Sequence, residues 1–152
     1  MENTNLFFWF IGLFEGEGSF SITKNKAKKI TITSTDRDVL EKVQLLLGGN
    51  IVMPKIRNEK WKQEYVWYLN KNESKDIILK MLPFLSSRRR KRANEWLVFY
   101  DEQLKIINER LDKKKYAIEN IHRLREEGFT HKQIADKLGY ERSHISKMLK
   151  QF

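Results

Sequence analysis

The most constraining feature of this sequence is an apolar stretch near its start that ends in two glutamates. Every residue of Leu6–Phe14 except Gly12 is apolar, and a second glycine, Gly16, lies four residues after Gly12. A helix over these residues is apolar on nearly every side, which predicts burial on nearly every side. Glycine weakens a helix by roughly 1 kcal/mol relative to alanine, and residues four apart share a face. The glycine pair therefore predicts close approach of a second backbone. A bilayer-spanning helix needs about 20 apolar residues, so we expect no membrane span here.

Two acidic residues, Glu15 and Glu17, stand at the C-terminal end of this helix, and Gly18 is expected to cap it. Negative charge at this end opposes the helix dipole. Free carbonyl oxygens of the last turn gather at the same place, and a carboxylate beside a bare carbonyl suits Mg²⁺. In an arbitrary protein, a solvated pair of glutamates is the commoner interpretation.

The rest of the first hundred residues alternates strand-like and helix-like patterns. We expect an α+β fold with one four-stranded antiparallel sheet and helices on a single face. The predicted strands are 19–23, 29–34, 51–57 and 64–69. The predicted helices are 36–47, 73–82 and 93–111, with a basic hairpin loop at 24–28 and a charged loop tip at 58–62.

The open face of such a sheet is expected to be basic and rich in hydroxyl groups, as a surface that reads a DNA major groove would be. The predicted DNA-contacting residues on this face are Ser21, Thr23, Lys29, Thr31, Thr33, Lys55 and Arg57. Lysines of the adjoining loops join them, namely Lys24, Lys26, Lys28, Lys60 and Lys62. An ordinary solvated sheet face is an equally good interpretation of the alternation alone.

The charge balance points to a polyanionic partner. The net charge is +10, and half of it lies in residues 86–115, around the cluster Arg88–Arg92. Such an excess favours nucleic acid over a membrane surface. The chain has no cysteine, which excludes disulfides and thiolate metal sites. With no secretory signal visible, we expect an intracellular protein, cytoplasmic, nucleoid-associated or organellar.

The stretch Phe10–Phe20, which reads FIGLFEGEGSF, resembles the LAGLIDADG signature of homing endonucleases position by position, with glutamate at both acidic positions. The order of elements that follows, to about Arg110, also resembles that family. The resemblance implies an αββαββα core with a saddle-like sheet in residues 1–111. With one motif in the chain, it implies the homodimeric subfamily.

Residue roles follow from this resemblance. It implies that Glu17 holds a catalytic Mg²⁺ or Mn²⁺ ion, helped by the backbone carbonyl of Gly16. It places Gly12, Leu13 and Gly16 in a dimer seam formed by the helix Phe10–Gly18. The implied substrate is a long, nearly palindromic site in double-stranded DNA.

A basic residue at the start of the last core helix assists catalysis in the family. One register assigns this role to Arg89 and another assigns it to Arg88. Arginine stays charged at neutral pH, so it would neutralise charge or position solvent. A phosphate-contacting cluster without a catalytic role, including Arg90 and Arg92, is an equal alternative. The resemblance also implies a water-orienting residue at the end of the second strand, which is Ser34 or Thr35.

The C-terminal residues 116–152, after a predicted basic linker at 112–115, resemble a small all-α helix-turn-helix domain. Ala135 allows close helix crossing, Gly139 supplies the turn, and apolar residues fall where a three-helix core needs them. The second helix would contact DNA through its outward residues, namely Arg142, Ser143, His144, Ser146 and Lys147. A module for protein contact is the alternative.

Three functions compete at this point. The first is a site-specific, Mg²⁺-dependent DNA endonuclease of the homing type with an added DNA-binding arm. The second is a transcriptional regulator on the same scaffold without nuclease activity, which the retained Glu17 disfavours. The third is an RNA-binding intron maturase, which exposed aromatic side chains on the sheet, such as Trp61 or Tyr65, would favour.

Overall fold

The computed structural model describes residues 2–55 and 62–149 of the 152-residue chain. The chain forms two compact units, which divide between Gln103 and Leu104. Within the described residues, no helix is both long enough and apolar enough to cross a membrane.

The first unit follows the predicted order of helices and strands. Its elements are α1 (Glu2–Glu17), β1 (Gly18–Thr23), β2 (Lys26–Ser34), α2 (Arg37–Leu47), β3 (Asn50–Val52), β4 (Tyr65–Asn70), α3 (Lys71–Met81), η1 (Leu82–Phe84) and the first part of α4 (Ser87–Glu126). The predicted α+β class with a four-stranded antiparallel sheet is therefore confirmed.

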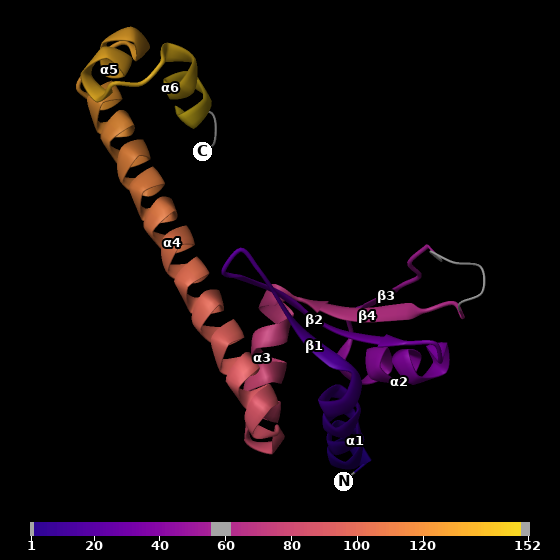
Figure 1. Cartoon of the computed structure of the whole chain (residues 1–152). Coiled ribbons are helices and arrows are strands. Elements are labelled where there is room, and N and C mark those ends of the chain that lie inside the picture. The colour runs from indigo at the N-terminus through magenta and orange to yellow at the C-terminus, as the bar shows by residue number, and fades with distance from the viewer. Residues whose placement is uncertain (1, 56–61, 150–152) are drawn as a thin grey trace. The chain divides into compact units, whose positions relative to one another are not determined.

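The four strands are ordered β1-β2-β4-β3, and all three pairings are antiparallel. Because successive side chains point to opposite faces, the register aligns whole rows of side chains. One row is apolar and faces the helices: Gly18, Ile32, Trp67 and Ile51 are paired in turn, and all of them except the half-buried Ile51 are buried. Figure 1 shows α1 and α2 beneath the sheet, with the opposite face open.

Aromatic side chains fill the space between α1 and the sheet. Phe10 and Phe14 are fully buried, and they contact the rings of Trp67 and Phe20 at centroid distances of 6.0 and 5.1 Å. The indole nitrogen of Trp67 donates to the carbonyl of Gly48 at 2.8 Å, so its polar edge is satisfied inside the core. This packing fixes the end of α1 against the start of β1.

The hairpin between β1 and β2 is tighter than the sequence predicts. Lys24 and Asn25 form a two-residue turn with φ of 49° and 54°. Two positive φ values in a row match the hairpin turn whose twist suits the flanking strands. Lys26 and Lys28, predicted to lie in the loop, therefore belong to β2.

The prediction that Gly18 caps the first helix was wrong. Gly18 begins β1 and is paired with Ile32, so it is not a left-handed helix cap. A Cβ atom at this position would lie 2.4 Å from the ring of Phe14. Glycine is needed because the strand starts directly against that ring.

The second unit contains the later part of α4 with α5 (His131–Leu138) and α6 (Arg142–Leu149). Its core consists of Ile121, Leu124, Ile134, Ala135 and Ile145. Thr130 caps α5 by a reciprocal hydrogen-bond pair with Gln133, and Gly139 ends it at φ 69°. Residues 112–115, predicted to be a linker, are helical and lie within the continuous α4.

Candidate functional site

The C-terminal end of α1 presents one acidic side chain to solvent. Glu17 is exposed, and within residues 2–55 and 62–149 its carboxylate has no hydrogen bond and no ion pair. Glu15 differs, because its Oε2 accepts a hydrogen bond from the backbone N–H of Ser86 at 3.3 Å. The two glutamates of the motif therefore have different surroundings, and Glu17 is the one available to a ligand.

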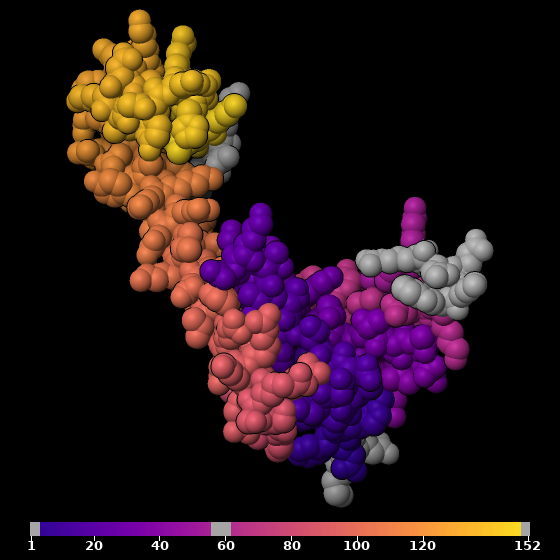
Figure 2. Space-filling view, viewed as in Figure 1, coloured from indigo at the N-terminus to yellow at the C-terminus, as the bar shows by residue number. Residues whose placement is uncertain are grey.

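Arg89 of α4 is bound to the same end of α1. Its Nε donates to the carbonyl of Glu15 at 3.1 Å and its Nη2 to the carbonyl of Gly16 at 3.2 Å. Its Nη1 donates to the carbonyl of Gly18. In Figure 2 the start of α4 lies directly against α1. The side chain is partly buried and donates to three backbone carbonyl groups.

A cationic pocket of about 380 Å³ lies where β1 begins beside α4. Within the described residues, its lining comes from Ser19 and Phe20 of β1 and from several residues of α4, namely Arg88, Arg89, Lys91, Arg92 and Glu95. Arg92 is paired with Glu95 at 2.7 Å, whereas Arg88 and Lys91 are exposed. A pocket with several cations and a hydroxyl group suits an anion such as a phosphate group.

A divalent metal ion fits this site only if other molecules supply most of its oxygen ligands. Magnesium takes about six oxygen ligands in octahedral geometry and usually keeps several waters. The described residues contain no cluster of three acidic or histidine side chains, and Glu17 offers a single carboxylate. The carbonyl of Gly16 already accepts from Arg89. The remaining oxygens would have to come from water, a phosphate group or a second copy of the chain.

The hydroxyl of Ser34 lies at the same end of the sheet as Glu17, since Gly18 is paired with Ile32, two residues before the end of β2. Its Oγ accepts a hydrogen bond from the N–H of Asp36 at 3.0 Å. This bond shapes the turn into α2 and leaves the hydroxyl proton free to donate.

A stripe on the outer side of α1 is open. Phe8, Gly12 and Gly16 are spaced by four residues, so they share a face, and all three are exposed. A Cβ atom added at Gly12 or Gly16 would meet nothing within 4 Å. Leu13 beside them is half-buried. The prediction of burial on nearly every side thus fails on this face in the single chain.

The sequence of residues 6–112 matches the model of the LAGLIDADG-like domain family. The chain belongs to this family. Among curated proteins, no sequence matches the chain significantly. Similar solved structures include an archaeal intron-encoded homing endonuclease, I-Vdi141I, complexed with DNA; it is 21% identical, with a TM-score of 0.47 over 99% of this chain and 98% of that one.

Two further similar structures are those of the homing endonuclease I-CvuI in complex with its target and the LAGLIDADG meganuclease I-AabMI bound to uncleaved DNA. I-CvuI is 18% identical, with a TM-score of 0.49, over 99% of this chain and 96% of its own. I-AabMI is 24% identical, with a TM-score of 0.49, over 73% of this chain and 40% of its own.

The LAGLIDADG-like domain carries its polar residues on the open sheet face. Ser19, Thr31, Tyr68 and Asn50 form one cross-strand row, and none is buried. Alternation along the strands puts Ser21, Thr23, Lys29 and Thr33 on the same side. The ammonium group of Lys29 lies 4.5 Å from the centre of the Tyr68 ring. Five of the seven residues predicted for this face, Ser21, Thr23, Lys29, Thr31 and Thr33, thus share it, and the structure adds Ser19, Tyr68 and Asn50.

The remaining predicted residues lie beyond the strands or outside the described residues. Lys55 was wrongly placed on the sheet face, because β3 ends at Val52 and Lys55 follows it. Lys62 precedes β4, and both lysines are exposed. Arg57, Lys60 and Trp61 lie outside the described residues. Tyr65 is half-buried and lies against Arg37, whose guanidinium is 5.7 Å from the ring centre.

The basic cluster divides by what each residue contacts. Arg90 donates to the carbonyls of Leu82, Pro83 and Leu85 at 3.1–3.2 Å, so it closes η1. Arg88 and Lys91 remain for an external anion. Lys91 and Ser19 were missed by sequence reasoning, as was Ser86, although a serine before a long helix is a known capping signal.

The C-terminal helices present the side chains expected of α6. Arg142, Ser143, His144 and Lys147 are exposed, whereas the hydroxyl of Ser146 lies 3.3 Å from the ring of His131. A pocket of about 380 Å³ next to them is lined by Arg125, Thr130, His131, Lys132 and Arg142. Three of these five side chains are permanently cationic at neutral pH, and only Arg142 was predicted.

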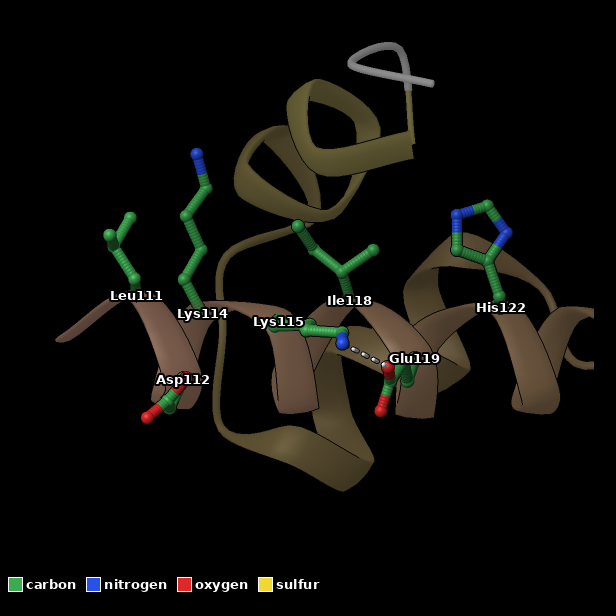
Figure 3. Close-up of a pocket in the computed structure, with 7 residues that line it drawn as sticks. All are labelled: Leu111, Asp112, Lys114, Lys115, Ile118, Glu119 and His122. Atoms are coloured by element: carbon green, nitrogen blue, oxygen red, sulfur yellow. Dashed lines mark ion pairs between the residues drawn. The ribbon is translucent and has the colours of Figure 1, made fainter. Parts of the chain in front are cut away.

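A larger hollow of about 690 Å³ lies along α4. Figure 3 shows Leu111, Lys114, Ile118 and His122 projecting to one side of the helix, with Lys115 paired to Glu119 at 3.9 Å. Within the described residues, the side chains that line this hollow all come from α4.

Proposed function

We propose that this protein is a site-specific endonuclease that cuts both strands of double-stranded DNA as a metal-dependent homodimer. The observation that carries the proposal is the exposed Glu17 at the end of the family's signature helix, which has no partner within the described residues and lies next to a cationic pocket. An acid at the C-terminal end of a helix is unfavourable on its own. A bound cation is the simplest reason to keep it there.

DNA would lie on the open sheet face. A row of hydroxyl, phenol and amide groups, Ser19 to Asn50, crosses all four strands, and lysines flank it at Lys26, Lys28 and Lys29. Such groups donate to and accept from base edges in the major groove, while lysines bind phosphates.

The second subunit would pack on the open stripe of α1. Phe8, Gly12 and Gly16 offer an apolar side chain and two positions without Cβ atoms, which lets another helix backbone come close. A two-fold axis through this seam would place one Glu17 on each side. The target is then expected to be nearly palindromic.

In the reaction, Glu17 would hold the Mg²⁺ or Mn²⁺ ion. When bound, a divalent cation supplies charge stabilisation to the attacking and leaving oxygens of a phosphodiester. Arg88 and Lys91 would hold the phosphate in the pocket, and Arg88 is the cation we assign to charge neutralisation. Ser34 would use its free hydroxyl proton to orient a water molecule. Whether Gly16 also serves as a ligand stays a prediction.

The C-terminal unit would act as a DNA-binding arm of the helix-turn-helix type. The exposed residues of α6 would face bases or phosphates, and the pocket of Arg125, Lys132 and Arg142 would take a phosphate of the backbone. This arm would add affinity through phosphate contacts.

The proposal is tested by incubating the protein with a randomised duplex DNA library in Mg²⁺, beside EDTA. We expect one recurrent cleaved site in Mg²⁺ and none in EDTA. Glu17→Gln should bind that site and leave it uncut. The matched control is Glu41→Gln, which loses an exposed carboxylate on α2 and should cut normally. Tight binding to one site without any cleavage would overturn the endonuclease claim and favour a regulator.

A further inference from the structure

The end of α1 is capped by a residue from far along the chain. The last carbonyls of a helix have no partner within it, and α1 has no basic residue in its own last turn. Arg89 supplies three N–H donors to this region, at the carbonyls of Glu15, Gly16 and Gly18. Its positive charge also offsets the negative end of the helix dipole.

The contact is reciprocal. Glu15 at the end of α1 accepts from the N–H of Ser86 at 3.3 Å, and the hydroxyl of Ser86 accepts from the N–H of Arg89 at 3.5 Å. The acid of one helix thus lies at the start of the other helix, and the base of the second lies at the end of the first. Each charge has the sign that the end of the opposite helix favours.

This arrangement brackets Glu17. The carbonyls of residue 16 and residue 18, on either side of it in sequence, both accept from the guanidinium of Arg89. The backbone on both sides of the proposed metal-binding residue is therefore fixed by one planar side chain. The carboxylate itself has no other bond within the described part of the chain, so its direction depends on this backbone.

We propose that Arg89 is a positioning residue, which holds the backbone around Glu17 and does not itself contact the phosphate. Three of the five N–H donors of the guanidinium are bonded to backbone oxygens, whereas Arg88 and Lys91 line the same pocket without such bonds in the described part of the chain. Arginine suits the task because its planar fork reaches several oxygens at once. We call these three bonds from Arg89 the clamp. The clamp does not depend on the proposed function, but its effect on metal binding rests on that function.

The test compares Arg89→Gln with Arg88→Gln, which loses the same charge one residue away. In metal-free buffer without DNA, we expect the unfolding midpoint of Arg89→Gln to fall by roughly 5 °C or more. Arg88→Gln should stay close to wild type. Arg89→Lys should lie between, because one ammonium group cannot reach three carbonyls. A midpoint of Arg89→Gln equal to that of Arg88→Gln would overturn the clamp.

A second measurement separates positioning from mere stability. Mn²⁺ is titrated into each folded variant bound to the DNA site that the cleavage selection returns, and bound Mn²⁺ is followed by electron paramagnetic resonance. Removing a positive charge should by itself tighten cation binding, and Arg88→Gln should show this. Arg89→Gln should instead weaken Mn²⁺ binding several-fold, since Glu17 is no longer held. Tighter binding in both variants would refute the positioning role.

Failure of the proposed function gives a different result. In that case the cleavage selection returns no DNA site and wild type alone binds no Mn²⁺ at Glu17, while the difference in unfolding midpoint between Arg89→Gln and Arg88→Gln persists.

Discussion

The ring of Phe8 in α1 meets the ring of Phe84 in η1 edge to face, with centroids 5.0 Å apart. Both rings stay open to solvent, at 46% and 53% exposure. Phe8 belongs to the stripe that contains Gly12 and Gly16, so Phe84 widens this stripe beyond α1. An apolar edge of this kind fits the proposed contact between two copies of the chain.

Replacing Phe84 by serine should therefore weaken the proposed dimer. Loss of one buried phenylalanine corresponds to about 1.5–3 kcal/mol, so the dimer dissociation constant should rise roughly tenfold or more. Sedimentation equilibrium measures this constant. Leu45→Ser on α2 is the control, because Leu45 is 90% exposed; an equal effect of both variants would count against the Phe84 edge.

A leucine at Gly12 should separate folding from association. The stripe leaves open space at Gly12, so the single chain should keep its fold, and loss of a helical glycine should favour it slightly. The same side chain would obstruct a second helix backbone. We expect a folded monomer by light scattering and circular dichroism, and a stable dimer of Gly12→Leu would exclude this face as the seam.

Alanine at Gly18 should destabilise the fold strongly. Its Cβ atom would lie 2.4 Å from the ring of Phe14, which is itself buried. Overpacking of this kind costs about 1–3 kcal/mol. Urea unfolding should show the loss for Gly18→Ala and none for Gly16→Ala, where nothing lies within 4 Å. Combination with Phe14→Leu should not rescue the Gly18→Ala change, because leucine keeps Cγ and the backbone carbonyl oxygen of residue 14 would lie 2.5 Å from the added Cβ atom.

One ion pair gives the first unit a pH dependence. Lys75 of α3 lies 2.9 Å from Asp101 of α4, and its hydrogen bond to that carboxylate raises the pKa of Lys75 above the ordinary 10.5. Because the folded-state pKa is the higher one, the stabilisation is fully present below pH 10.5 and is lost as the pH rises through the folded-state value.

Wild type should therefore lose more stability than Lys75→Met when the pH is raised from neutral to above that range. The difference should be small, because both side chains are exposed to water and salt. Lys80→Met on the same helix is the control for general alkaline effects. Parallel losses in wild type and Lys75→Met would show that the pair contributes nothing.

The cationic pocket of the C-terminal unit should be visible in the salt dependence of DNA binding. Each phosphate contact contributes about 0.9 to the slope of log affinity against log salt. The double variant Arg125→Gln/Arg142→Gln should lower that slope by about 2 if both residues bind phosphate. Arg37→Gln/Lys80→Gln, which removes the same charge from α2 and α3, should leave the slope unchanged.

Local patterns predicted most of the first unit. The alternation of Phe20 and Ile22 with Ser21 and Thr23 was enough to place β1, and the same logic placed the open face. The turn at Lys24 and Asn25 was missed because glycine is the usual residue at positive φ, and asparagine alone was a weak signal. The run of charges at 112–115 was interpreted as a linker, although lysine favours helices and Lys115 is paired with Glu119 one turn later.

The candidate site was harder to predict than the fold. Glu17 was identified through the family resemblance, because its carboxylate has no local partner that a pattern could show. The bonds from Arg89 to α1 span more than 70 residues, and no sequence period encodes such a contact. Two equally basic neighbours, Arg88 and Arg89, were therefore indistinguishable until the fold placed one of them against three carbonyls.

The clamp on α1 implies that Arg89 and Glu17 are under different kinds of selection, one for the fold and the other for the proposed activity. Under the proposed function, a descendant of this chain that abandoned cleavage would be free to lose Glu17, but it would still need Arg89 to close the helix. Descendants that keep the fold would then keep Arg89 whether or not they cut DNA. Loss of Glu17 alone would identify those that no longer do.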